Sequence, residues 1–247
     1  IVQGQVDVSG DISYNLHPVD GLLLLKNMMG GSITPARLAA SITGGTMQTF
    51  TLELGDWGQQ TAPAALSLMK RVGSTTGRTF VISGARVNQV TFAGSINNPV
   101  KATANIIAQG MTTSASSFGA ISLSTVRPFL FFDGTYTSDG TTTAYGTTVE
   151  DIISFELTIN NNILSDDNAR RIGSRFVRLL PPGQREITLN LAQRFDTTTA
   201  FESWLAQSQM SIRLHLDSQV TIGAVAANTT YSMRFDFPNV RYFDGAT

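Results

Sequence analysis

Apolar and polar residues alternate along much of this chain of 247 residues. A period of two is typical of β-strands with one buried face, because successive side chains point to opposite sides of a sheet. Gly, Asn, Asp or Pro lies near the ends of the alternating runs, which favours antiparallel strands joined by turns. The runs lie at residues 7–16, 50–54, 87–92, 100–108, 152–159, 187–191, 212–216 and 231–242. The pattern therefore predicts a mainly β protein.

Helical patterns are few and short. Asp20 can cap a helix over residues 22–29, and the two glycines that follow would end it. A second helix is predicted to begin among the threonines before Phe201. In that helix Phe201, Trp204 and Leu205 would form one apolar face that lies on a sheet. Both helices are expected to flank the sheets.

Weaker patterns predict two further helices and two long loops. One candidate helix covers residues 63–69, and another runs from Ser165 towards Leu180, where two prolines would stop it. Residues 110–120 and 135–148 are rich in small and hydroxyl-bearing residues, mainly Thr, Ser, Gly and Ala. Such stretches bury little apolar surface and favour extended, mobile backbone, so both are predicted to be loops.

The order strand, helix, strand, strand occurs twice. The first series covers residues 5–16, a helix from 20, 48–55 and 78–92, and the second covers 185–194, a helix from 198, 210–217 and 230–243. This order predicts two tandem copies of an antiparallel β-sandwich or barrel with a short flanking helix. The copies are assigned to residues 1–110 and 111–247, and they can share sheets.

The composition points to assembly and away from DNA coating. Charged residues make up 14% of the chain, against about 25% in a typical soluble domain. Such a surface is expected to be rich in neutral polar groups or buried against other subunits. The net charge of −1 offers no basic field for a duplex, and the absence of cysteine excludes disulfides and thiolate sites. No apolar run approaches the roughly 20 residues that span a bilayer, so no membrane span is predicted.

Catalytic residue types do not gather into a motif. His17 and His215 are interpreted as surface imidazoles, because no Gly-x-Ser-x-Gly nucleophile motif accompanies them. Glu150 and Asp151 are neighbours, which point to opposite faces of a strand. The residues at 160–168 are rich in Asn and Asp but lack the spacing of a calcium loop, and no phosphate-binding glycine motif is present. The sequence therefore predicts neither an enzyme nor a bound metal or cofactor.

One cluster of charge suggests an interaction surface. It consists of Arg170, Arg171, Arg175, Arg178 and Arg185, with Phe176 among them. Arginine suits ion pairs between proteins, so in a nearly neutral chain an assembly interface is favoured over the alternative, a grip on nucleic acid. Tyr136 and Tyr145, in the predicted loop 135–148, are assigned to the same interface. Replacing Arg175 and Arg178 with Glu is expected to prevent assembly and leave the fold intact.

Three stretches share their order and spacing with one known family. They are residues 6–16 followed by the Leu-rich helix, residues 80–88 with a Gly before Val-Asn, and residues 154–163, which read Ser-Phe-Glu-Leu-Thr-Ile-Asn-Asn-Asn-Ile. Together they resemble the tail tube proteins, or major tail proteins, of long-tailed, non-contractile bacteriophages. The similarity spans most of the chain.

The resemblance implies a structural virion protein with a tail-tube-type β-sandwich. Inner strands of neighbouring subunits would join into a continuous barrel, which would also remove unpaired edge strands. Rings would stack into a hollow tube around a tape-measure protein, contact tail-end proteins, and pass double-stranded DNA through a neutral or acidic lumen during ejection. The family's usual six tube folds per ring imply a trimer of two-copy chains, or a hexamer if the chain holds one copy. The protein would be made in the host cytoplasm and act in the phage tail.

Two other classes of function remain open. One is a β-sandwich module for carbohydrate binding or adhesion, and the other is a different phage subunit, such as a decoration or tail-tip protein. Sugar-binding modules normally expose clustered Trp and Tyr, whereas Trp57 and Trp204 are far apart in the sequence. Electron microscopy of the concentrated protein distinguishes these functions, because rings or hollow tubes are expected only of a tail tube protein.

Overall fold

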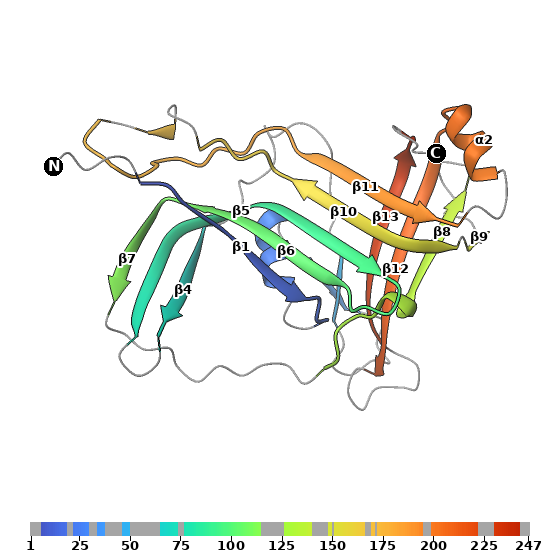
Figure 1. Cartoon of the computed structure of the whole chain (residues 1–247), viewed down its shortest axis with the longest axis horizontal. Helices are drawn as coiled ribbons and strands as arrows, with labels where there is room; N and C mark the ends of the chain where they lie inside the picture. The colour runs from blue at the N-terminus through green and yellow to red at the C-terminus, as the bar shows by residue number, and fades with distance from the viewer. Residues whose placement is uncertain are drawn as a thin grey trace.

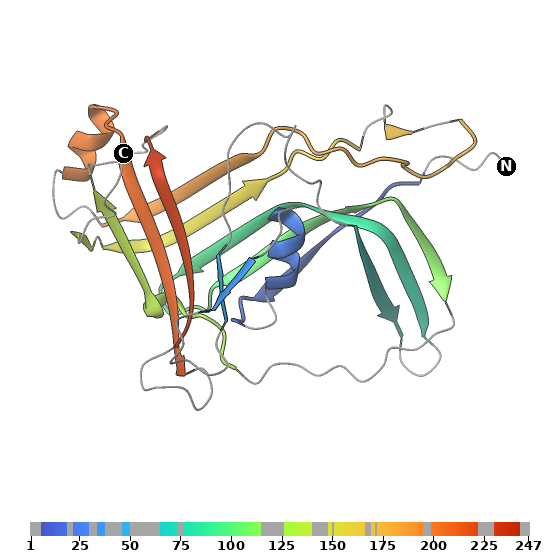
Figure 2. The same cartoon turned by 180° about the vertical axis from the view of Figure 1, so that it is seen from behind.

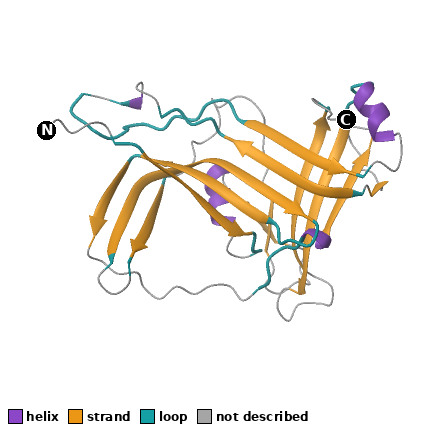
Figure 3. Cartoon of the chain, viewed as in Figure 1, coloured by secondary structure: helices purple, strands orange, loops and turns teal. Residues whose placement is uncertain are grey.

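A computed structural model gives the fold of the chain (Figure 1), and strands make up most of it (Figure 3). The structure describes residues 6–18, 22–29, 34–37, 46–49, 65–73, 77–114, 126–139, 148–149, 151–165, 169–170, 172–194, 199–221 and 230–242. The prediction of a mainly β protein with antiparallel strands and short helices is confirmed.

The strands are β1 (Val8–Asn15), β2 (Thr34–Arg37), β3 (Thr46–Thr49), β4 (Leu66–Val72), β5 (Arg78–Ser95), β6 (Lys101–Ala108), β7 (Gly110–Ser114), β8 (Gly134–Asp139), β9 (Thr148–Val149), β10 (Ile152–Asn160), β11 (Glu186–Gln193), β12 (Met210–Thr221) and β13 (Thr230–Val240). The helices are α1 (Leu22–Met29), α2 (Thr199–Leu205) and the single 3-10 turn η1 (Phe131–Asp133). Strands β2 and β3 pair only with each other among the described residues.

The largest sheet follows the strand order β1-β6-β5-β10-β11, which we call the main sheet. All four neighbouring pairs in this path are antiparallel. Alternation places Val90, Phe92, Leu157 and Ile159 on one face, where each is at most 1% exposed. The opposite face carries polar side chains, so the two faces of the main sheet differ sharply in chemistry.

A second sheet, in the order β13-β12-β8-β9, packs on the apolar face of the main sheet. Its strands cross those of the main sheet steeply in Figure 1. The rings of Phe92 on β5 and Phe235 on β13 have centroids 5.3 Å apart, and Leu214 and Leu216 of β12 belong to the same buried cluster. Full burial of each such side chain contributes about 1.5–3 kcal/mol. This shared core makes the protein a β-sandwich.

Helix α1 packs against one part of this core. Leu25, Met28 and Met29 are buried in the cluster that also contains Val87 of β5. Figure 2 shows α1 on the concave side of the main sheet, where it covers the middle strands. The helix predicted over residues 22–29 is therefore present, with Leu25, Met28 and Met29 turned to the sheet and Leu23 exposed.

Strand β5 extends well beyond the sandwich. Its first half pairs with β4 on one side and with β7 on the other, and we call these three segments the arm. The strand bends in Figure 1, and Gly84 lies between the residues that pair with β7 and those that pair with β6, with φ of +63°, a left-handed conformation that glycine adopts readily. A Cβ at Gly84 would also overlap the side chain of Gln109, which connects β6 to β7. Figure 1 shows the arm turning away from the main sheet beyond this bend.

Most of the alternating runs form strands, as predicted. The run at residues 50–54 lies outside the described residues, and the other seven coincide with parts of β1, β5, β6, β10, β11, β12 and β13. The main sheet takes β1, β6 and β5 from residues 1–110 and β10 and β11 from residues 111–247. The two proposed copies therefore share a sheet, and the tandem repeat itself stays a prediction.

Four predictions of local structure are wrong. Residues 66–72, within the candidate helix 63–69 and beyond it, form β4, because pairing with β5 outweighs a short helical pattern. The described part of residues 165–180 contains no α-helix. Residues 110–114 and 135–139, predicted to be loops, form β7 and most of β8, because Thr is a β-branched residue that suits strands.

The packing of α2 also differs from the prediction. The apolar face that includes Phe201 and Leu205 was expected to lie on a sheet, but these side chains are 42% and 68% exposed. The Phe201 ring instead contacts the Trp204 ring at a centroid distance of 5.5 Å. An apolar helix face thus stays open on the protomer.

Candidate functional surfaces

The face of the main sheet that points away from the core carries ordered rows of polar side chains. Residues in register across all five strands form a central row of hydroxyl groups: Ser13, Thr103, Thr91, Thr158 and Thr188. The hydroxyl oxygens of Ser13 and Thr103 lie 3.0 Å apart, and those of Thr91 and Thr158 lie 3.2 Å apart. Hydrogen bonds therefore link hydroxyl groups across neighbouring strands.

A row of polar residues flanks the hydroxyl row on each side. One row contains Asp11, Asn105, Gln89, Asn160 and Glu186, and the other contains Asn15, Lys101, Ala93, Glu156 and Asn190. The Asn105 amide donates to Oδ1 of Asp11 over 2.7 Å, and the Gln89 amide donates to Oγ1 of Thr91 over 3.3 Å. We call the three rows the polar face.

The polar face is weakly acidic and contains no aromatic ring. The three rows contain three carboxylates, from Asp11, Glu156 and Glu186, and one ammonium group, from Lys101. Their net charge is therefore −2. Hydroxyl and amide groups interact well with water, whereas phosphate groups are held mainly by Lys and Arg. Stacking on sugars or bases needs exposed aromatic rings. The polar face is therefore suited to stay hydrated beside a polyanion without holding it.

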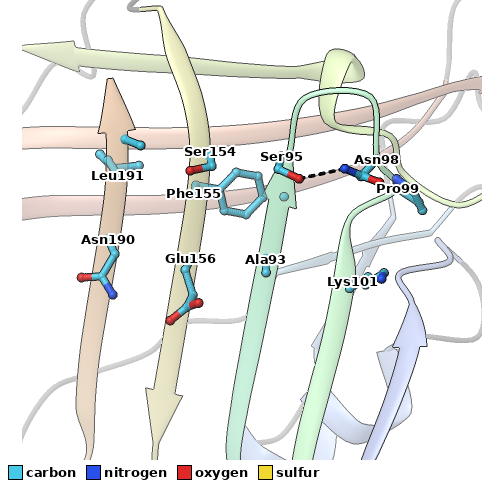
Figure 4. Close-up of a pocket in the computed structure, with 12 residues that line it drawn as sticks. Ala93, Ser95, Asn98, Pro99, Lys101, Ser154, Phe155, Glu156, Asn190 and Leu191 are labelled. Atoms are coloured by element: carbon cyan, nitrogen blue, oxygen red, sulfur yellow. Dashed lines mark hydrogen bonds between the residues drawn. The ribbon is translucent and has the colours of Figure 1, made fainter. Parts of the chain in front are cut away.

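A shallow pocket of about 530 Å³ opens at one end of the polar face, between the ends of β5, β6, β10 and β11. Figure 4 shows Lys101 and Glu156 on different strands, with Ala93 between them, and Ser95 bonded to Asn98 over 3.0 Å. No His or Tyr lines the pocket. Within the described ranges, no three His, Asp or Glu residues are close enough to hold a metal ion.

The segment between β10 and β11, residues 161–185, forms a second surface. It packs on the sandwich through a small apolar cluster that contacts Ile107 of β6. The cluster consists of Ile163, Ala169, Val177 and Leu180. The Val6 amide donates to the carbonyl oxygen of Arg175 over 3.1 Å, and Arg170 forms an ion pair with Asp7. We call this segment the connection.

The outer side of the connection is basic and apolar. Arg175 and Arg178 are exposed, as are Phe176 at 36%, Leu179 at 59% and Ile172, which is fully exposed. Exposed apolar side chains among arginines are typical of the core of a protein interface. Arg175, Phe176 and Arg178 are thus exposed on the connection, whereas the side chain of Arg170 is only 10% exposed and pairs with Asp7, and Arg171 lies outside the described residues.

Two residues assigned to the interface are buried within the protomer. Arg185 is 5% exposed, and its guanidinium donates to Oδ1 of Asn161 and to the carbonyl oxygens of Met28 and Met29. Burial lowers the pKa of Arg185, because it disfavours the charged form. Tyr136 is 4% exposed in a cluster with Met210 and Ile212. Tyr145 lies outside the described residues.

A comparison with known families adds a decisive observation. The model of the family described as "Phage tail tube protein" matches residues 1–245, which is almost the whole chain. The chain belongs to the phage tail tube protein family. No match was found among curated proteins. The earlier resemblance is thus confirmed at the level of the family.

Membership in this family gives the protein a structural role. A tail tube protein is a structural component of the virion tail, and such proteins assemble with copies of themselves into a tube. In the described part of this tail tube protein, no helix is long and apolar enough to cross a membrane. The family is a structural one.

Sequence reasoning singled out arginines of the connection as an interface, which stays a prediction, and it missed the polar face. The signal lay in the alternating Thr and Asn residues of β5, β6, β10 and β11. The alternation shows that these residues share one face of their own strand. It does not show which strands are neighbours, and that pairing turns scattered hydroxyl groups into a continuous row.

Proposed function

We propose that copies of this protein close into rings, that the rings stack into a hollow tail tube, and that the polar face lines its lumen. The observation that supports this most is the composition of the polar face, with fifteen positions that carry three carboxylates and only Lys101 as a cation. Duplex DNA carries about one negative charge per 1.7 Å of its axis, so each lumenal cation would retard its passage. A hydrated, slightly repulsive wall allows double-stranded DNA to slide during ejection.

The connection supplies contacts between protomers in this proposal. Its exposed Phe176, Leu179 and Ile172 would be covered on assembly, and Arg175 and Arg178 would pair with carboxylates of a neighbouring copy. Arg185 and Tyr136 are not part of this contact, because both are already buried in their own protomer. The loss of exposed apolar surface provides the free energy for association.

The preferred ring is a trimer, in which each chain supplies two tube folds. The proposed tandem order of strands and helices motivates this number, and a hexamer follows if the chain supplies one fold. Symmetry in end-on electron micrographs decides between them, because a trimer of tandem copies has exact threefold and only approximate sixfold symmetry. The tube would form in the host cytoplasm around a tape-measure protein and end on other tail proteins.

A single-cysteine experiment tests the orientation of the polar face. The chain contains no cysteine, so one substitution introduces a unique thiol. Glu156→Cys and Thr188→Cys place it on the polar face, and Ser232→Cys places it on the exposed outer face of β13. Each variant is assembled, labelled with biotin-maleimide and then incubated with streptavidin, which is too bulky to diffuse freely along a narrow channel.

The proposal expects streptavidin along the whole length of Ser232→Cys tubes and only at the ends of tubes of the other two variants. Streptavidin along the length of the Glu156→Cys and Thr188→Cys tubes would show that the polar face is external. A wild-type protein that forms neither rings nor tubes at high concentration would contradict the assembly itself.

A further inference from the structure

The main sheet has an odd number of strands, and this fixes the relative direction of its edges. Its path of five strands contains four antiparallel steps, so β1 at one edge and β11 at the other run in the same direction. The arrows of β1 and β11 in Figure 1 agree with this. Each edge strand has eight residues, and neither has a second strand neighbour among the described residues.

Among the described residues, the two edge strands of the main sheet lack several features that often prevent pairing with another chain. Edge strands are usually protected by Pro, Lys, a bulge or a very short length. Neither β1 nor β11 contains Pro, Lys or Arg. The register of β1 with β6 is unbroken over eight residue pairs, and that of β11 with β10 is unbroken from Glu186 to Ala192.

The second sheet is protected at both of its edges. Strand β9 has only two residues. Strand β13 contains Pro238, has two register shifts against β12, and carries an ion pair between Arg234 and Asp236 at 3.0 Å. The contrast within one protomer indicates that the main sheet, and not the second sheet, is built to continue into another chain.

Edge strand β1 also leaves apolar surface uncovered on the core side. Ile12 on this face is 38% exposed, whereas Ala104, its partner in β6, is fully buried. On the opposite edge, Ile187 and Leu189 of β11 lie half-buried on the same face of the sheet. A strand β11 placed beside β1 would therefore continue both faces, with apolar side chains covering Ile12 and polar ones extending the polar face.

We propose that β11 of one protomer pairs in parallel with β1 of the next. This inference rests on the proposed ring, in the form in which each chain supplies one tube fold, because a pseudo-sixfold trimer would make the junction between chains resemble the antiparallel pair of β5 and β10. Rotation about a ring axis preserves the direction of a strand along that axis, so two edges that run the same way within a protomer must meet in parallel between protomers. Pairing of β1 with β1, or of β11 with β11, would be antiparallel and would stop at a dimer. A parallel pair forms evenly spaced, slanted hydrogen bonds and is slightly weaker per residue than an antiparallel pair.

Disulfide trapping measures the direction of this junction. Cysteine is placed on β1 at Ser9 or Ser13 and on β11 at one of four positions that share the polar face: Glu186, Thr188, Asn190 or Ala192. Each of the eight double variants is assembled and mildly oxidised, and chain multiples are separated on a denaturing gel. A disulfide needs Cα atoms about 4.4–6.8 Å apart, whereas each strand residue advances about 3.4 Å, so a mismatch of four residues abolishes the product.

The readout does not depend on knowing the register. In a parallel junction, the best partner on β11 moves towards Ala192 when the β1 cysteine moves from Ser9 to Ser13, and the products form a ladder that ends at the closed ring. A shift towards Glu186 would show an antiparallel junction and overturn the proposal. Tubes that give no cross-link in all eight variants would overturn it while leaving the proposed function intact. Absence of rings and tubes from the unmodified protein would overturn both.

Discussion

Arg185 donates a hydrogen bond from Nε to Oδ1 of Asn161 over 2.8 Å, beneath the last turn of α1. The Asn161 amide group in turn donates to the carbonyl oxygens of Met28 and Val87 over 3.0 and 3.2 Å. These contacts join the end of β10, the residue before β11, the end of α1 and the middle of β5. A cation beside the carbonyl groups at a helix C-terminus is also favourable electrostatically.

Replacement of Arg185 with Lys is expected to lower the free energy of unfolding by about 1–3 kcal/mol, because an ammonium group cannot reproduce the fork of donors and buried acceptors lose their partners. Urea unfolding followed by circular dichroism measures the change. Arg194→Lys is the control, since Arg194 is exposed and such surface changes usually stay within about 0.5 kcal/mol. Equal effects of the two substitutions would contradict a structural role for Arg185.

Gly94→Ala is expected to destabilise the sandwich by about 1–3 kcal/mol, because overpacking a filled core forces neighbouring side chains to move. A Cβ at Gly94 would overlap the ring of Phe155 and approach Cδ2 of Phe131 to 3.1 Å. Gly10→Ala on β1 is the matched control, since a Cβ there meets nothing within 4 Å. Thermal unfolding of both variants should give a clear loss at Gly94 and none at Gly10.

The double variant Arg175→Glu/Arg178→Glu is expected to remain folded and to stop forming tubes, because it reverses the charge of the exposed side of the connection. Arg194→Glu/Arg241→Glu changes the net charge by the same amount at two exposed positions elsewhere. Sedimentation of assembled tubes and circular dichroism of the protomers give the two readouts. Undiminished tube yield in the first variant would remove the connection from the assembly interface.

The alkaline stability of the fold should depend on Tyr14. Burial raises the pKa of Tyr14, because the folded protein disfavours the phenolate. Below the unfolded pKa of about 10 both states are protonated and this stabilising difference is fully present. Above it the unfolded state loses its proton first, so stability falls by up to about 1.4 kcal/mol per pH unit until the folded pKa is passed. Urea unfolding of Tyr14→Phe from pH 8 to 11 should show a shallower decline than that of the wild-type protein.

Positive charge on the polar face should slow the release of DNA. Phage particles with Thr103→Lys/Thr188→Lys tubes are expected to eject DNA more slowly, and the delay should shrink as salt rises, because phosphate contacts depend strongly on salt. Thr135→Lys/Ser232→Lys adds the same charge to the outer face of the second sheet. An equal delay in both sets of particles would contradict a lumenal polar face.

The sequence predicted the elements better than their arrangement. Strands such as β10 and β11 follow from alternation alone, and α1 was predicted from a candidate N-cap and from the glycines that follow it in the sequence. The contact between Thr91 and Thr158 could not be read in this way, because it depends on β5 and β10 being neighbours across 67 residues. Local patterns specify which face of a strand is apolar, and the order of strands is decided by packing of the whole core.

The surroundings of the Arg185 side chain likewise could not be predicted from the local sequence. Arginine is almost never fully buried, so its place in a run of arginines favoured a surface role. The acceptors that make burial possible are the carbonyl oxygens of Met28 and Met29, more than 150 residues earlier in the chain. Nothing near Arg185 in the sequence reveals them. Arg175 and Arg178 are exposed, and their role in an assembly interface stays a prediction.

Strand β5 gives the protomer an unbroken mechanical link. Its 18 residues run from the tip of the arm into the polar face without an intervening loop. A force applied to the arm meets no flexible loop before the polar face. It therefore either bends the backbone at Gly84 or is transmitted along the strand to the hydroxyl row. The arm and the polar face, which is proposed to line the channel, are thus joined by one continuous strand.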